Sequence, residues 1–176
     1  KQEYLDLFHV PPTAVSMKLV IGSGKQLSLS LRELKLRQLS ADPEALNLNP
    51  SFALGVFNYS GWQNIAQGGK LTKGDGKTIF DTKYGSRGSE FPLAGPGTYT
   101  LSAKATGNGF NSTAHVDIFD AEGKTLMRAS VRDFEKPNYF VVPAGATSAS
   151  LLVYSCLLEE VRLKRVGDEE AIEKFR

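Results

Sequence analysis

The sequence predicts an all-β protein built as an antiparallel β-sandwich. Three observations support this fold class: apolar and polar residues alternate with a period of two, turn-forming residues separate the alternating stretches, and the 176 residues include 17 glycines. Alternation places one side of each strand against a core. Several short strands at this spacing indicate a sandwich or a barrel rather than a helical protein.

The clearest alternation lies in the second half of the chain, at residues 98–106, 115–119, 151–154 and 160–164. Turn-forming residues lie between these strands, at 95–97, 107–109, 120–123, 135–138 and 143–145. Gly and Asn accept a positive φ and Pro fixes φ, so each of these segments predicts a turn. The turn at 107–109 predicts that 98–106 and 115–119 form one strand pair.

The chain repeats one pattern near its two ends. Residues 10–39 and again 142–166 run from a Val-Pro turn through small residues and an apolar strand to an alternating closing strand. Self-similarity is the sequence sign of repeated units. We therefore expect 1–39 to be the closing strands of a preceding β-module or an added strand pair, and 47–166 to be a complete sandwich. Alternatively, the two segments are alike only because all amphipathic strand pairs are alike.

Two short segments predict a linker or a helix. Residues 40–46 lie between the two sheets as a linker, with Pro43 suited to a first helical position. Residues 167–176 start with Asp168 and Glu169 and finish with Lys174 and Arg176, the charge order that a helix dipole favours. We expect a C-terminal linker or the start of a helix there.

The composition is that of an ordinary globular domain, with 41% hydrophobic and 23% charged residues and a net charge of +2. This charge predicts no nucleic-acid partner, and no apolar stretch is long enough to predict a membrane span. Cys156 is the single cysteine, which excludes an internal disulfide, and its apolar neighbours predict a buried, inert thiol. Because the chain begins at Lys1 rather than Met, we expect a mature, excised or truncated product, in which any export signal is no longer visible.

Three stretches resemble a known family. Residues 47–55 (NLNPSFALG) with 60–62 (SGW), residues 93–105 (LAGPGTYTLSAKA), and residues 142–163 from VPAGA to LEEVRL follow one another in the family's order. They resemble the opening, the middle strand and the closing strand of carbohydrate-binding modules of the CBM4/9/22 type. That family belongs to the galactose-binding-like jelly-roll superfamily. The resemblance spans roughly 47–166 and implies a jelly-roll sandwich.

The resemblance also implies a function. It predicts non-catalytic carbohydrate binding by an accessory module of a bacterial, secreted or cell-surface, polysaccharide-active enzyme, a glycoside hydrolase or a lyase. The expected partners are a polysaccharide or oligosaccharide and the neighbouring domains of a larger protein. The alternative is a structural sandwich that packs against a catalytic domain and binds no sugar. An exposed aromatic platform would favour the first interpretation.

Members of this family often hold a structural calcium ion near the start of the module. The acidic pair Glu159 and Glu160 stands where the family often has two Asp, and Ala53 stands where it often has Glu. The resemblance therefore implies a calcium ligand at Glu160, away from the sugar site. The loss of one carboxylate and the lengthening of another weaken a site that needs six to eight oxygens.

Aromatic residues in polar, Gly-rich segments are the first candidates for sugar binding. Tyr59 and Tyr84 would supply flat apolar platforms, and Arg87 would supply a fixed fork of hydrogen-bond donors. Trp62, the single tryptophan, is a further stacking candidate, although the sandwich core accounts for it better. For the 81–88 segment, an ordinary connecting loop explains the residues equally well.

The polar side of the predicted strand pair is the second candidate. Lys104, His115 and Asp117 alternate with apolar residues and would share one face, open to a glycan or simply solvated. Catalysis finds no support, because no nucleophile, phosphate-loop or dinucleotide motif is present. Adjacent Glu159 and Glu160 are expected to point to opposite faces of their strand, so they could not act together across a glycosidic bond.

Overall fold

The computed structural model describes residues 10, 14–18, 36, 44–53, 62–64, 70–82, 85–88, 90–134 and 136–175. The chain divides into two units, one of Val10–Ala41 and one of Lys1–His9 with Asp42–Arg176. In the first unit, the described residues 10, 14–18 and 36 are not in strands. The rest of the strand pair predicted at 1–39 lies outside the described residues.

The second unit is mostly antiparallel β-sheet, as predicted. Its strands are β1 (Trp62–Asn64), β2 (Lys70–Gly74), β3 (Lys77–Asp81), β4 (Ser86–Gly88), β5 (Phe91–Pro92), β6 (Gly97–Phe119), β7 (Thr125–Val131), β8 (Asn138–Val142) and β9 (Ser148–Arg165). The helix α1 (Asp168–Phe175) follows, with three acidic residues in its first turn. The sequence predicted a helix start at this place. The strand connections that define a jelly roll stay a prediction.

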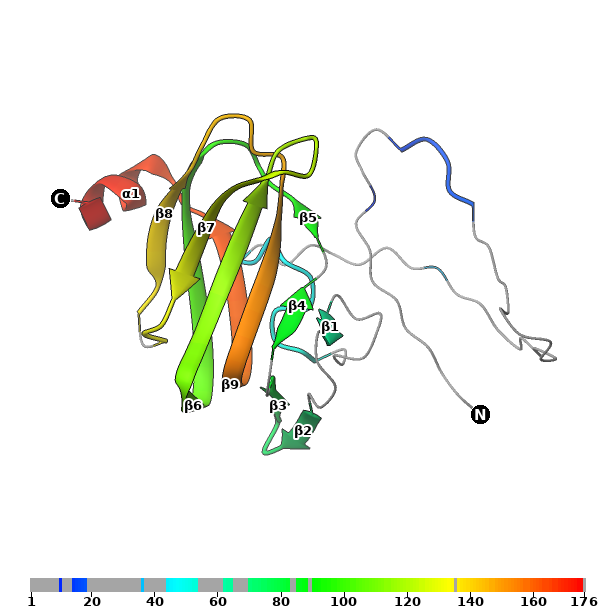
Figure 1. Cartoon of the computed structure of the whole chain (residues 1–176), viewed down its shortest axis with the longest axis vertical. Coiled ribbons are helices and arrows are strands. Elements are labelled where there is room, and N and C mark those ends of the chain that lie inside the picture. Colours follow the sequence, from blue (N-terminus) through cyan, green and yellow to red (C-terminus); the bar gives the residue numbers. More distant parts are fainter. Residues whose placement is uncertain are drawn as a thin grey trace. The chain divides into compact units, whose positions relative to one another are not determined.

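The two longest strands, β6 and β9, each bend, so that one half of the strand lies in each layer of the sandwich (Figure 1). The first layer contains residues 97–105 of β6 and 158–165 of β9, with β8 on one side and β3 and β2 on the other. The second layer contains residues 113–119 of β6 and 148–154 of β9, with β7 on one side and β4 and β1 on the other. β5 pairs with β9 at Ala149 and Ser148.

The predicted turn at 107–109 is wrong, and so is the strand pair that it implied. Residues 97–119 form one continuous 23-residue strand, and both halves of it pair with β9 instead of with each other. The pairing shifts register in this region, where Gly107 lies opposite Leu157. Glycine inside a strand commonly marks a bend at the corner of a sheet, and Gly107 lies at a register shift between the two halves of β6.

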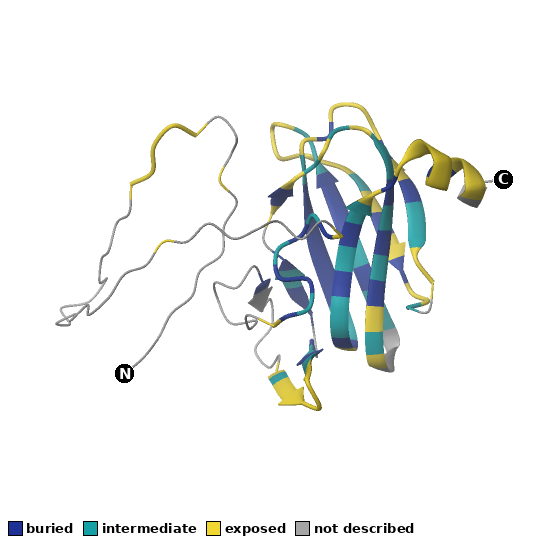
Figure 2. Cartoon of the chain, turned by 180° about the vertical axis from the view of Figure 1, so that it is seen from behind, coloured by how far each residue is buried: buried dark blue, intermediate teal, exposed yellow. Residues whose placement is uncertain are grey.

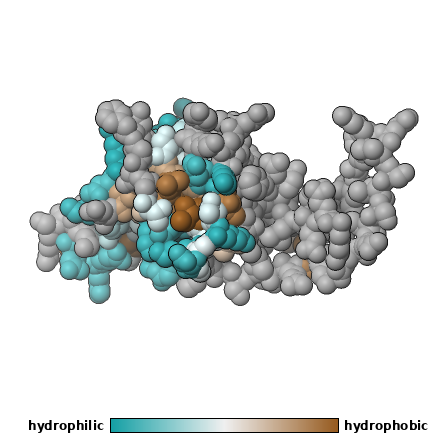
Figure 3. All heavy atoms as spheres, turned by 90° about the horizontal axis from the view of Figure 1, so that it is seen from below, coloured by the Kyte–Doolittle hydropathy of each residue, from teal (hydrophilic) through white to brown (hydrophobic). Residues whose placement is uncertain are grey.

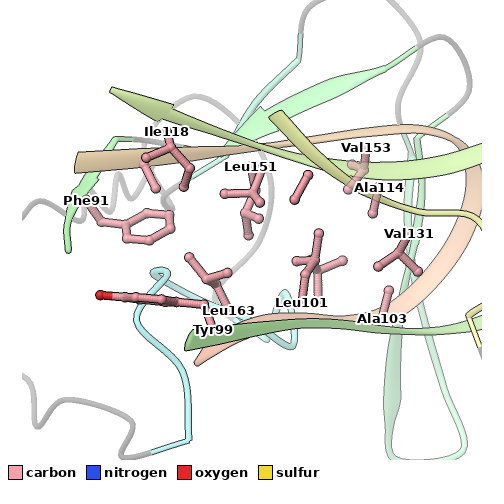
Figure 4. Packing of buried hydrophobic residues seen from close by; sticks show 14 of the residues in the cluster. Phe91, Tyr99, Leu101, Ala103, Ala114, Ile118, Val131, Leu151, Val153 and Leu163 are labelled. Atoms are coloured by element: carbon pink, nitrogen blue, oxygen red, sulfur yellow. The ribbon is translucent and has the colours of Figure 1, made fainter. Parts of the chain in front are cut away.

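The core lies between the two layers. Ile118, Leu151 and Val153 point from the second layer towards Leu101 and Leu163 of the first (Figure 4). Each of these five side chains is completely buried. Seen from behind, buried and less buried residues alternate along the long strands (Figure 2), which is the period-two pattern of the sequence.

The segment before β1 belongs to the sandwich. Ala45 is buried, the Leu46 amide donates to the Leu163 carbonyl at 2.8 Å, and Phe52 is completely buried in the core. Residues 44–46, the described part of the predicted linker, are therefore packed against β9 and are not helical.

Candidate functional site

The outer face of the second layer gathers polar side chains from four strands. His115 and Asp117 alternate with the buried Ala114, Val116 and Ile118 of β6, so they point away from the core. The strand register sets two rows across this face: one holds Arg87, Leu152, His115 and Ser130, and the other holds Ser150, Asp117 and Arg128. We call this surface, together with Tyr154, the polar face.

A carboxylate between two arginines lies at the centre of the polar face. Asp117 Oδ1 and Oδ2 accept hydrogen bonds from Arg128 Nε and Nη2 at 2.5 and 2.8 Å. Arg87 Nη2 approaches the same Oδ2 at 3.9 Å. The Asp117 side chain is only 5% exposed, whereas those of Arg87 and Arg128 are 43% and 50% exposed. The buried charge is therefore paired, as a buried charge must be, and its partners reach the surface.

Asp117 also fixes the charge of its partner. The hydrogen bond from Arg128 to the Asp117 carboxylate raises the pKa of the guanidinium above its usual range. Arg128 thus stays protonated, and the bidentate pairing holds its planar group in one orientation.

His115 and Tyr154 lie beside this cluster. The His115 ring meets the Tyr154 ring edge-on, with centroids 5.9 Å apart, and its Nδ1 lies 2.6 Å from Ser130 Oγ. Partial burial lowers the pKa of His115, and Arg128 and Arg132 lower it further against the opposing effect of Asp117. These effects favour the neutral form of the His115 ring.

The position of Tyr154 depends on a glycine. Gly85 has a φ of +132°, and a Cβ at this residue would lie 2.6 Å from Tyr154 Cε1. Any larger residue would push the ring out of its place and would also strain the backbone. The Tyr154 side chain is half-buried and lies at one end of the polar face.

The structure brings together three of the predicted site residues, Arg87, His115 and Asp117. It adds Arg128 and Tyr154, which the sequence analysis missed. Arg128 lies directly opposite Asp117 in the register of β6 and β7, and an opposite-charge pair across the predicted turn at 120–123 was the pattern that could have revealed it. Tyr59 and Tyr84 lie outside the described residues, so their predicted roles stay predictions.

Lys104 does not join the polar face, which corrects the expectation that it shares one face with His115 and Asp117. It lies in the first layer, where its Nζ pairs with Glu159 Oε2 at 3.1 Å. The reason is the bend of β6, which carries the two halves of the strand into different layers.

Trp62 is a core residue and offers no face to a sugar, which corrects its place among the binding candidates. Its side chain is 1% exposed, and its ring lies 5.0 Å from that of Phe52 and 6.3 Å from that of Phe80. The indole Nε1 donates to the Asn49 carbonyl at 3.2 Å, so its polar atom is satisfied inside the fold.

Glu159 and Glu160 both lie on the outer face of the first layer, so the expectation of opposite faces is wrong. A register shift opposite Lys104 and Ala105 places an extra residue in β9, and alternation fails there. Glu159 pairs with Lys77 and Lys104, and Glu160 pairs with Arg162 at 2.6 Å. Both carboxylates are thus held by cations of the first layer.

These pairings do not fit a calcium site at Glu160. Its oxygens bind a guanidinium, and the side-chain oxygen of Asn47 accepts the Leu163 amide. Within the described part of the chain, no group of three His, Cys, Asp or Glu side chains is placed to hold a metal ion. Calcium needs several oxygens that are free to point at the ion.

We therefore expect that a chelator leaves the melting midpoint of the protein unchanged. A ligand that binds only the folded state raises its stability, so removal of a structural ion would lower the midpoint. The measurement is a pair of melting curves with and without EDTA, followed by re-addition of calcium. A lower midpoint that calcium but not magnesium restores would contradict this expectation.

One face of the described surface has a hydrophobic centre. Seen from below, hydrophobic residues gather in the middle of the described surface and hydrophilic residues surround them (Figure 3). Leu157, where β9 changes layer, is 40% exposed. Among the described residues, no helix has the length and apolar character needed to span a membrane.

Cys156 lies at the same bend. Its side chain is buried, and burial raises the pKa of the thiol. A buried, protonated thiol is a poor nucleophile, so the structure agrees with the prediction of an inert cysteine.

Comparisons with known proteins show no family for this chain. No family model matches the chain, and no curated protein matches it either. Among solved structures, the chain is similar to one in the crystal structure of accessory secretory proteins 1, 2 and 3 from Streptococcus pneumoniae. That similarity has a TM-score of 0.44 and 12% sequence identity, and it covers 73% of this chain and 100% of the other.

Proposed function

We propose that this protein binds carbohydrate without catalysing a reaction, and that the polar face is its binding surface. The observation that carries the proposal is the convergence of Arg87, His115 and Arg128 around a buried Asp117, with the Tyr154 ring beside them. These groups come from strands of one layer, and Arg128 and His115 already have side-chain hydrogen-bond partners within it.

The chemistry of the polar face suits sugar hydroxyls. Guanidinium groups donate hydrogen bonds in a fixed fork, and the histidine ring and Ser130 hydroxyl can donate and accept. Tyr154 adds an apolar surface at the end of the face, against which the carbon skeleton of a sugar can pack. Carbohydrate sites combine such an apolar surface with a few fixed polar groups.

At the level of the whole protein, the resemblance supports an accessory role. We propose a module of a secreted or cell-surface polysaccharide-active enzyme, which holds the enzyme on its substrate. The alternative remains a structural sandwich that packs against a neighbouring domain. The two differ in one measurable property, because only the first binds a glycan when isolated.

The test is a glycan array followed by titration of the best ligand. We expect Arg87→Ala and Tyr84→Ala to weaken binding by about 1–3 kcal/mol each, or roughly tenfold to a hundredfold. Arg87 would lose donors on the polar face, and Tyr84 is the stacking platform that the sequence predicts. Melting curves of the variants should match that of the parent within a few degrees.

Lys104→Ala is the matched control, because it also removes a cation but lies in the first layer with Glu159. It should bind as the parent does. A protein that binds no glycan on the array, or equal losses in Lys104→Ala and Arg87→Ala, would argue against the polar face as a sugar site.

A further inference from the structure

We propose that the glycan bound at the polar face is acidic, and that its uronate carboxylates bind between Arg87 and Arg128. This inference rests on the proposed function and names the substrate class of the same site. It follows from the charge of the face, from the direction of its hydrogen bonds and from the arrangement of the two guanidinium groups.

The charge of the polar face is positive. In its two central rows, the described charged side chains are Arg87, Arg128 and Asp117, so two cations share one anion. Arg132, just after β7, lies close enough to His115 to lower its pKa. Glu90 lies beyond the next row, where its carboxylate accepts a hydrogen bond from Ser148. The excess positive charge attracts a negatively charged ligand more strongly than an uncharged one.

The hydrogen-bonding groups that reach the surface are mainly donors. Guanidinium nitrogens only donate, and the Arg87 and Arg128 side chains are 43% and 50% exposed. Asp117 could accept, but its side chain is 5% exposed and is bound to Arg128 through both oxygens. A ligand therefore meets donors first, and a carboxylate is the sugar group that only accepts.

Asp117 brings the guanidinium groups of Arg87 and Arg128 close to each other. The Nη2 atoms of Arg128 and Arg87 approach the same oxygen, Oδ2, at 2.8 and 3.9 Å. Asp117 is thus a positioning residue for Arg128 and brings Arg87 close to it, while the side chains of both arginines remain about half exposed. A planar carboxylate matches a guanidinium group through two parallel hydrogen bonds, and this geometry distinguishes it from a hydroxyl.

The experiment compares one polymer in two charge states. The full chain is run in affinity gels that contain polygalacturonate or the same polymer with its carboxylates methyl-esterified. We expect retardation by the acid form and at least about tenfold weaker binding to the ester, because hydrogen bonds to charged groups are stronger than those to neutral ones. Added salt should weaken binding to the acid form.

Two variants of Arg87 test the geometry. Arg87→Ala should bind polygalacturonate about tenfold more weakly than the parent. Arg87→Lys keeps the positive charge but loses the planar pair of donors, so its affinity should lie between those of the parent and of Arg87→Ala. Arg162→Ala is the matched control, because it removes one arginine from the outer face of the first layer, where Arg162 pairs with Glu160. It should bind as the parent does.

The outcomes separate the two proposals. Equal binding of the acid and the ester, or binding of neutral glycans alone, would overturn the acidic ligand and leave carbohydrate binding intact. Binding of no glycan at all would overturn both. Equal binding of polyglutamate, or equal losses in Arg87→Ala and Arg162→Ala, would show that net charge rather than the polar face attracts the polymer and would also overturn the inference.

Discussion

Replacing Trp62 by alanine is expected to lower the free energy of unfolding by about 3–5 kcal/mol, the usual cost of removing a large buried aromatic side chain. Trp62 is 1% exposed and packs against both Phe52 and Phe80. Its loss would leave a cavity between these rings. It would also remove the hydrogen bond from the indole to the Asn49 carbonyl, which also accepts one from the Phe52 amide.

The measurement is urea unfolding followed by circular dichroism, because the variant lacks the single tryptophan as a fluorescent probe. Val141→Ala is the control: Val141 is 61% exposed on β8, so its truncation should change stability by no more than about 0.5 kcal/mol. Any loss of sugar binding by Trp62→Ala should follow the loss of folded protein. If this variant stays as stable as the parent and loses binding, Trp62 is the sugar platform after all.

The period-two pattern predicted which residues face the core, because alternation is a property of each strand alone. Leu101, Val116 and Leu163 are buried as that pattern requires. The same local pattern placed His115 and Asp117 together on an outward face. These inferences needed no knowledge of which strands are neighbours.

The sequence could not predict where a strand changes layer. Gly107 was expected to lie in a tight turn, and it lies instead within β6 where the strand pairs with Leu157 of β9. A glycine allows either outcome, and pairing with a distant strand decides between them. The misplacement of Lys104 follows from this one ambiguity.

Predicting the candidate site would have required even more knowledge of which strands, far apart in sequence, pair with each other. Arg87 and Asp117 are far apart in sequence and meet only because β9 lies between β4 and β6. The extra residue at Glu159 likewise appears only when β9 is aligned with β6, because a bulge is a property of two strands.

Asn47→Ala is expected to cause the second largest loss of stability, because the Asn47 side chain supplies hydrogen-bond partners to backbone groups along one edge of β9. Its Nδ2 donates to the Val161 carbonyl and its Oδ1 accepts the Leu163 amide, each at 2.9 Å and buried.

The backbone of the same segment completes the pairing of this edge. The Pro50 carbonyl accepts the Val161 amide, and the Leu46 amide donates to the Leu163 carbonyl. Truncation of Asn47 would leave two buried backbone groups without hydrogen-bond partners, at about 1–3 kcal/mol each. It would also loosen the segment whose Phe52 side chain packs in the core.

Asn47→Asp should also be destabilised, since its carboxylate can accept the Leu163 amide but would face the Val161 carbonyl without a proton to donate. Asn138→Ala removes one exposed hydrogen bond to the Ser130 carbonyl and should cost at most about 1 kcal/mol. Urea unfolding of the three variants checks the order, and an Asn47→Ala variant no less stable than Asn138→Ala would mean that the segment before β1 does not hold the sandwich closed.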